Sequence, residues 1–104
     1  MCNVDYEGSL SLDEDLIQQA NLRPYEKVLV ANVSNGERFE TYIIPALAGS
    51  REVGLNGAAA RSAAVGDRII VMAFAMKEPE EEVTATVLIM DEHNNVKEVK
   101  QLKT

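Results

Sequence analysis

The sequence predicts a small, mainly β domain, a β-barrel with one or two short helices. Two observations lead to this class. Short runs of β-branched and other apolar residues recur at close spacing, and Gly- and Asn-containing turn signals separate them. The chain has 104 residues, and domains usually have roughly 100–150. We therefore expect residues 1–104 to form a single domain around one core.

Six segments carry the strand pattern. Two of them, 27–33 and 38–44, flank Ser34-Asn35-Gly36, where Asn-Gly favours a hairpin turn because both residues tolerate positive φ. Pro45 is expected to end the second of these strands. Further strands are predicted over 53–57, 68–76, 84–90 and 96–99. The segment 68–76 is almost wholly apolar, which is typical of a strand buried on both faces. Residues 91–95 predict a second hairpin turn.

One helix is expected directly after Asp13, which is a good N-cap residue. Glu14 and Asp15 suit the positive end of the helix dipole, and the residues that follow supply an apolar face. Pro24 prevents the helix from continuing. A second short helix is predicted over 58–64.

The charges are unevenly distributed along the chain. There are 17 acidic and 10 basic side chains, a net charge of −7. This balance disfavours nucleic acid or an anionic membrane as partner, because both select clustered Lys and Arg. The middle of the chain, 31–76, is neutral, and all of its bases are arginines: Arg38, Arg51, Arg61 and Arg68. These arginines either bind a small anion or form surface ion pairs.

Conventional catalytic side chains are scarce. His93 is the only histidine and lies in a predicted turn, and Cys2 is the only cysteine. This leaves little for a Ser-His or Cys-His site and predicts no metal site. There is no phosphate-binding glycine motif, and no evident site for pyridoxal phosphate. The start lacks a secretory signal, and no apolar run approaches the roughly 18–20 residues of a membrane span. We therefore expect a soluble, cytoplasmic protein.

The pair Gly8-Ser9 offers a different kind of chemistry. Glycine permits a strained backbone, and the Ser9 hydroxyl could attack the Gly8 carbonyl and convert the peptide bond to an ester. Elimination across Ser9 would then break the chain and leave a pyruvoyl group on the new N-terminus. Taken alone, Gly-Ser is no evidence for this chemistry, because the pair occurs by chance in many proteins and a plain turn is the favoured interpretation.

The surroundings of this pair resemble the pyruvoyl-dependent aspartate 1-decarboxylases. The resemblance rests on Tyr6-Glu7-Gly8-Ser9, Asp13-x-Asp15, Asn32-Val33-Ser34-Asn35-Gly36-x-Arg38-Phe39-x-Thr41-Tyr42, Gly49-Ser50-Arg51, Leu55-Asn56-Gly57-Ala58-Ala59-Ala60 and Val65-Gly66-Asp67. It implies a six-stranded double-psi β-barrel that assembles as a homotetramer in the cytoplasm, with no membrane partner. It also implies a carboxy-lyase that converts L-aspartate to β-alanine and CO2 for pantothenate synthesis, with a possible maturation factor.

The resemblance assigns a role to each site residue. Ser9 is the pyruvoyl precursor that forms a Schiff base with substrate, after cleavage between Gly8 and Ser9. Tyr42 is the proton donor, and Thr41 and Asn56 assist processing. Substrate binding is assigned to a further set, which also includes Thr41: Arg38, Gly57, Ala58, Ala59 and Tyr6.

The chain departs from the family pattern at its start. Members normally begin further upstream, with a basic first strand that carries a lysine near the substrate, and the sequence that starts at Met1 does not include this strand. We expect either that the true start lies upstream of Met1, which is the favoured interpretation, or that this is a shortened relative with impaired activity. The alternative to an active decarboxylase is therefore an unprocessed β-barrel relative that binds an acidic ligand or serves as an assembly subunit.

Overall fold

A computed structural model of the chain describes residues 8–57, 60 and 63–103. They form seven strands and one helix, in the order β1 (Ser9–Asp13), α1 (Glu14–Gln19), β2 (Lys27–Asn32), β3 (Arg38–Ala46), β4 (Val53–Asn56), β5 (Ile69–Met72), β6 (Thr84–Met90) and β7 (Val96–Lys103). The mainly β class with one short helix is confirmed. The second helix predicted over 58–64 falls largely on residues outside the described part of the chain.

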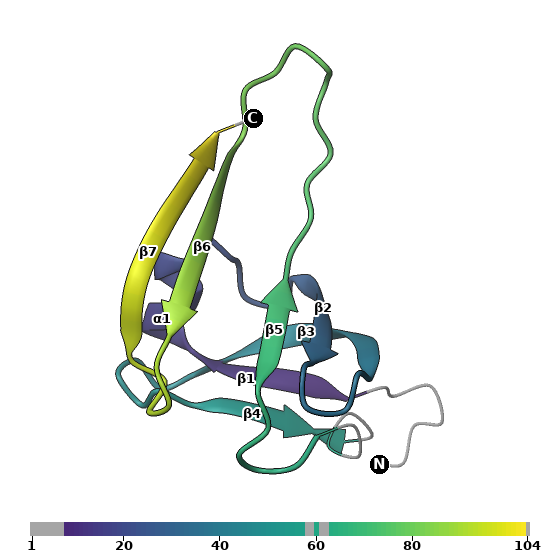
Figure 1. The fold of residues 1–104 in the computed structure, drawn as a ribbon, viewed down its shortest axis with the longest axis vertical. Coiled ribbons are helices and arrows are strands. Elements are labelled where there is room, and N and C mark those ends of the chain that lie inside the picture. The colour runs from purple at the N-terminus through teal and green to yellow at the C-terminus, as the bar shows by residue number, and fades with distance from the viewer. Residues whose placement is uncertain (1–7, 58–59, 61–62, 104) are drawn as a thin grey trace.

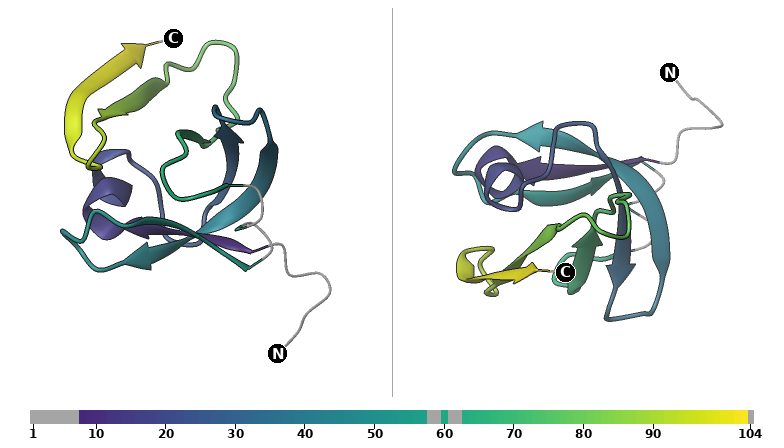
Figure 2. Two further views of the ribbon diagram at one scale, coloured as in Figure 1. Left: turned by 60° about the horizontal axis from the view of Figure 1, so that its bottom comes forward. Right: turned by 90° about the horizontal axis from the view of Figure 1, so that it is seen from above.

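Five strands form one sheet, in the order β4-β1-β3-β2-β5. Strands β1 and β3 are parallel, and the other neighbours in this sheet are antiparallel. The sheet curls around its core, and β6 and β7 form a separate hairpin beside it (Figures 1 and 2). This curled half-barrel is consistent with the double-psi β-barrel that the sequence predicts.

The core lies inside the curl. Its fully or nearly buried side chains come from β1, α1, β2 and β3: Leu10, Leu12, Leu16, Ile17, Val28, Val30 and Ile43. Leu88, Met90 and Val96 of the β6–β7 hairpin pack against this cluster. Burial of these apolar side chains is the main stabilising contribution to a fold of this kind, and it fixes which face of β1 and β3 points inward.

The predicted helix start at Asp13 is confirmed, and the same carboxylate has a wider role. Its oxygens accept hydrogen bonds from the backbone N–H groups of Asp15 (2.8 Å), Gly49 (3.0 Å) and Arg51 (2.7 Å). Burial raises the pKa of Asp13, but these three hydrogen bonds and the charge of Arg51 outweigh it, so the pKa lies below its ordinary value. Asp13 thus connects α1 to the β3–β4 loop.

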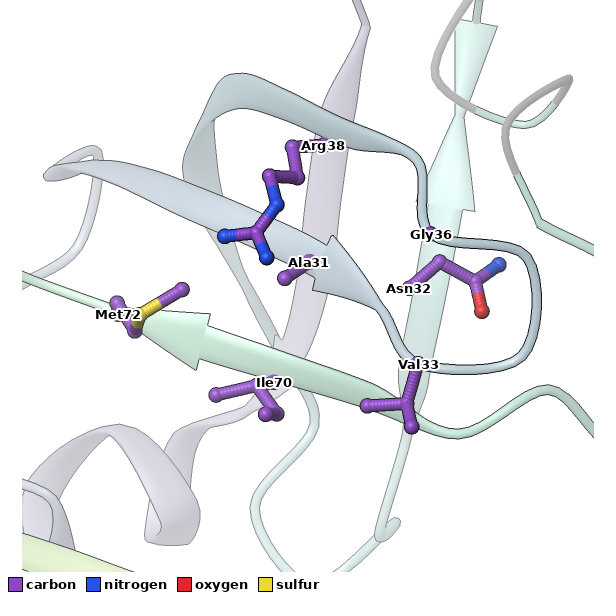
Figure 3. Close-up of a pocket in the computed structure, with 7 residues that line it drawn as sticks. All are labelled: Ala31, Asn32, Val33, Gly36, Arg38, Ile70 and Met72. Atoms are coloured by element: carbon purple, nitrogen blue, oxygen red, sulfur yellow. The ribbon is translucent and has the colours of Figure 1, made fainter.

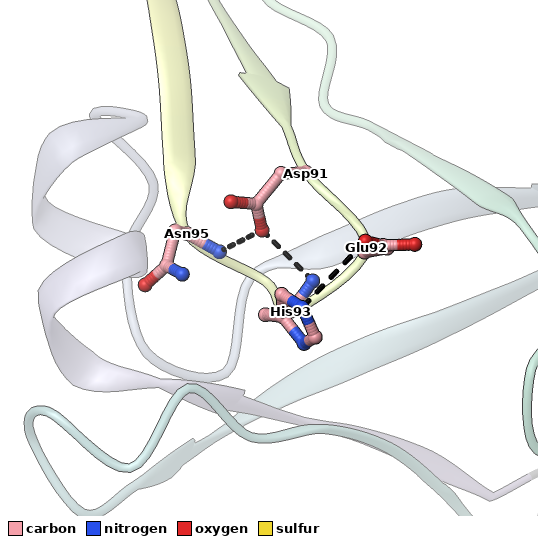
Figure 4. A network of polar contacts seen from close by, with 4 residues as sticks. All are labelled: Asp91, Glu92, His93 and Asn95. Atoms are coloured by element: carbon pink, nitrogen blue, oxygen red, sulfur yellow. Dashed lines mark hydrogen bonds and ion pairs between the residues drawn. The ribbon is translucent and has the colours of Figure 1, made fainter.

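Both predicted hairpin turns are confirmed. The β2–β3 turn lies where the Asn-Gly signal predicts it and Gly36 has φ +78°, but Asn35 does not have a positive φ, so the turn is not the two-residue type with positive φ at both positions. In the β6–β7 turn, the Asp91 carboxylate accepts hydrogen bonds from the backbone N–H groups of His93 (2.8 Å) and Asn95 (2.9 Å) (Figure 4). His93 is exposed and lies 3.6 Å from the Glu92 carboxylate, so it is a turn residue, as predicted.

Other predicted strand bounds were wrong. The strand expected over 68–76 covers only Ile69–Met72, and it is not buried on both faces, since Ile70 is half exposed and Phe74 and Met76 are exposed. Strand β3 does not end at Pro45 but continues to Ala46. Pro45 lies beyond Tyr42, the last β3 residue that pairs with β2, so its missing N–H group removes no hydrogen bond between β2 and β3. No helix of the described residues is long and apolar enough to cross a membrane.

Candidate active site

The Gly8–Ser9 pair lies at the start of β1. Gly8 has φ +102°, a conformation that residues with a side chain rarely adopt. Ser9 is fully buried, although it is the first residue of β1. The peptide bond between Gly8 and Ser9 is therefore held in a defined conformation and shielded from solvent on the Ser9 side.

Thr41 contacts this peptide unit directly. Its hydroxyl group donates a hydrogen bond of 2.9 Å to the carbonyl oxygen of Gly8, and the contact is buried. The contact follows from the parallel pairing of β1 and β3, in which Leu10 lies opposite Ile43. A donor on a carbonyl oxygen stabilises negative charge that develops there when the carbonyl carbon is attacked.

Asn56 approaches the same pair from the other side. It is paired with Ser9 across the antiparallel β1–β4 ladder. Its side-chain Nδ2 donates to Ser9 Oγ at 3.0 Å and to Ser11 Oγ at 2.8 Å. The amide group has two N–H hydrogens, so each hydroxyl receives its own hydrogen bond.

Tyr42 lies beside Ser9 on the neighbouring strand. Ser9 and Tyr42 directly precede the paired residues Leu10 and Ile43. Because side chains alternate along a strand, both face away from the core cluster to which Leu10 and Ile43 belong. Tyr42 is 36% exposed, and Lys27 is its partner on β2. The face opposite the core thus carries Asn56, Ser9, Tyr42 and Lys27 in one row across four strands.

Arg38 lies apart from this row. It starts β3, four residues before Tyr42, which is roughly 13 Å along an extended strand. There it lines a cavity of about 390 Å³, together with Ala31, Asn32, Val33, Gly36, Ile70 and Met72. Figure 3 shows Arg38 above Ala31, with Ile70 and Met72 on the adjacent strand. The structure therefore brings Gly8, Ser9, Thr41 and Asn56 into contact but does not bring Arg38 to them.

The remaining predicted site residues follow β4. Gly57 comes directly after Asn56 and has φ +63°. Ala58, Ala59 and Tyr6 lie outside the described residues. Among the residues that the structure does describe, no cluster of three or more His, Cys, Asp or Glu side chains could hold a metal ion.

Ser11 is a member of the site that sequence reasoning missed. It lies two residues after Ser9 on β1 and so shares its face of the sheet. The alternation Ser9-Leu10-Ser11-Leu12 was the available signal, but a strand was not predicted there.

The cluster presents two hydrogen-bond donors to one peptide junction. Thr41 donates to the Gly8 carbonyl oxygen, and Asn56 donates to the Ser9 hydroxyl oxygen. The carbonyl is thereby polarised, and the hydroxyl beside it is oriented. This arrangement suits an attack of the Ser9 hydroxyl on the Gly8 carbonyl carbon.

Comparison with known proteins identifies the family of the chain. A family model described as aspartate decarboxylase matches residues 1–97. A protein of Coprothermobacter proteolyticus named aspartate 1-decarboxylase is 86% identical over 103 residues, which cover 99% of this chain and 86% of that protein. A protein of Thermosipho melanesiensis with the same name is 50% identical, over 95% of this chain and 83% of that protein. Another, of Chlorobium chlorochromatii, is 55% identical, over 91% of this chain and 75% of that protein. The chain belongs to the aspartate decarboxylase family.

Proposed function

We propose that this chain is an aspartate 1-decarboxylase that converts L-aspartate to β-alanine and CO2, using a pyruvoyl group made from its own Ser9. Family membership supports the reaction. The observation that carries the self-processing is the buried hydrogen bond from the Thr41 hydroxyl to the carbonyl oxygen of Gly8. We also propose that residues 1–104 act as one domain.

The first step of processing exchanges an amide for an ester. Ser9 Oγ attacks the Gly8 carbonyl carbon, the C–N bond between Gly8 and Ser9 breaks, and the hydroxyl proton passes to the released nitrogen. The Gly8 oxygen carries negative charge while the carbon is tetrahedral. The Thr41 hydroxyl, 2.9 Å from that oxygen, stabilises this charge.

The second step breaks the chain. The Ser9 Cα loses a proton, a Cα=Cβ double bond forms, and the Cβ–Oγ bond breaks, so that Gly8 leaves as a carboxylate. One water then replaces the Ser9 nitrogen, which leaves as ammonia, and a ketone remains at residue 9. The two oxygens of the leaving carboxylate are those that receive hydrogen bonds from Thr41 and Asn56. The residues around Ser9 therefore fit the formation of the group.

The pyruvoyl group would supply a carbonyl that accepts the electron pair released when aspartate loses its α-carboxylate. Tyr42 lies beside position 9 on the same face of the sheet and returns a proton to the substrate carbon, since a phenol is protonated at neutral pH. Arg38 binds a substrate carboxylate. We assign Thr41, Gly57, Ala58, Ala59 and Tyr6 to the rest of the substrate site.

The separation between Arg38 and Ser9 within one chain favours an oligomeric enzyme. The exposed face around the cavity carries partly apolar side chains, among them Val33, Tyr42 and Ile70. We propose that copies of the chain cover this face in a homotetramer, and that a maturation factor can assist cleavage. We place the enzyme in the cytoplasm, where its single cysteine stays reduced.

Intact-mass spectrometry of the purified protein tests the proposal. The enzyme should contain two chains, residues 1–8 and residues 9–104, the second with an N-terminus blocked by a keto group. Ser9→Ala should remain whole and form no β-alanine. An unmodified whole chain after prolonged incubation, with aspartate binding but no CO2 release, would instead support an unprocessed ligand-binding relative.

A further inference from the structure

We propose that Ser11 is a positioning residue for self-cleavage, because its hydroxyl holds the Asn56 amide on the oxygen of Ser9. This inference rests on the proposed function, in which Ser9 is the cleaved residue. It adds a third side chain to the two that contact the Gly8–Ser9 junction directly.

The geometry places Ser11 next to the amide and not next to the scissile bond. In the β1–β4 ladder, Ser9 is opposite Asn56, and Ser11 is opposite Gly54. Asn56 reaches Ser11 diagonally across the ladder, a distance that longer side chains span. Gly54 has no side chain to stand between them. Ser11 itself is half-buried, and its flanking residues Leu10 and Leu12 belong to the core cluster, so its side-chain direction is fixed.

Two acceptors define the orientation of the amide better than one. The terminal torsion of an asparagine side chain has a broad energy minimum, so an amide with a single partner can rotate about it. Asn56 Nδ2 donates to Ser11 Oγ at 2.8 Å, which is shorter than its 3.0 Å hydrogen bond to Ser9 Oγ. With one N–H held by Ser11, the other N–H is directed at Ser9 Oγ.

The chemistry indicates which step depends on this contact. In the first step Ser9 Oγ is the nucleophile, and a donor on it helps only to orient it. In the second step the Cβ–Oγ bond breaks and negative charge develops on Oγ, where a fixed donor stabilises the transition state. Loss of Ser11 should therefore slow elimination more than the acyl shift, and the ester should accumulate.

Three variants at this position separate the hydroxyl from the shape of the side chain. Ser11→Thr keeps a hydroxyl acceptor. Ser11→Val has the shape of that threonine variant but no hydroxyl group, and Ser11→Ala removes the hydroxyl group without adding bulk. Each protein is made by cell-free synthesis, and cleavage is followed by intact mass with and without hydroxylamine, which cuts an ester at Gly8. We expect Ser11→Ala and Ser11→Val to be processed about 3- to 10-fold more slowly, with a hydroxylamine-sensitive species. Ser11→Thr should be processed at nearly the wild-type rate.

A double-mutant cycle tests whether Ser11 acts through Asn56. Asn56→Ala should slow processing, and adding Ser11→Ala to it should slow processing no further. Ser50→Ala serves as the matched control, because Ser50 is exposed in the β3–β4 loop and should be processed like wild type. Additive effects of the two substitutions would overturn the positioning role.

The outcomes for the proposed function and for Ser11 are distinguishable. A wild-type chain that stays whole and carries no ester would overturn self-processing and the role of Ser11 with it. A wild-type chain that is cleaved, while Ser11→Ala and Ser11→Val are cleaved equally fast, would overturn the role of Ser11 alone.

Discussion

The hydroxyl group of Thr41 donates a 2.9 Å hydrogen bond to the carbonyl oxygen of Gly8. The two residues are 33 positions apart in the chain and meet because β1 and β3 pair in parallel. Thr41 is buried, so this donor works in surroundings that screen charge weakly. A single strand register thus places a hydrogen-bond donor on the carbonyl group of the peptide bond at which we propose cleavage.

Replacing this donor should slow processing strongly while leaving the shape of the site nearly unchanged. We expect Thr41→Val to be cleaved at least about 100-fold more slowly than wild type, the usual cost of removing one oxyanion donor. Thr41→Ser keeps the hydroxyl and should be cleaved at a rate closer to wild type. Intact mass over time measures both rates. Equal rates for the valine and serine variants would contradict the role of the hydroxyl.

Tyr42 should separate processing from turnover. It lies beside Ser9 on the outer face of the sheet but makes no contact with the Gly8 carbonyl among the described interactions. Tyr42→Phe should therefore be cleaved at a rate close to wild type, and β-alanine formation should fall about 10²- to 10⁴-fold, the range for loss of a general acid. The assay counts β-alanine per processed chain. Undiminished turnover in this variant would remove Tyr42 as the proton donor.

Arg38 should affect the binding of aspartate and not the cleavage of the chain. It lies roughly 13 Å from Tyr42 along β3, beside the cavity. Arg38→Met should leave processing unchanged and raise the KM for aspartate about 10-fold or more, because a charge-assisted contact to a carboxylate is lost. The control is Arg23→Met, at an exposed position in the α1–β2 connection, which should behave like wild type. A KM that does not change in Arg38→Met would exclude Arg38 from the substrate site.

Local signals predicted most of the elements but not their partners. The Asp13 N-cap and the Asn35-Gly36 turn depend on neighbouring residues alone, and both were predicted from the sequence. Strand β1 was missed because it is short and follows a glycine, and its strand conformation depends on pairing with β3 and β4. Ser11 was missed for the same reason: its role depends on Asn56, 45 residues away. The segment 68–76 was predicted as a buried strand from its apolar composition, but no described element covers Phe74 and Met76.

The Asp13 carboxylate should make stability depend on pH in the acid range. Its pKa in the folded protein lies below the ordinary value of 3.8, so the unfolded chain binds a proton first as the pH falls. The stabilisation is therefore complete above about pH 3.8 and is lost as the pH falls through the lower pKa of the folded state.

Asp13→Asn should lower the melting temperature at about pH 6 by several degrees, because an amide cannot accept all three backbone N–H groups as well as a carboxylate does. The difference from wild type should shrink as the pH falls below about 3.8. Glu82→Gln, at an exposed position, is the control, and a wild-type-to-Asp13→Asn difference that is constant with pH would contradict the prediction.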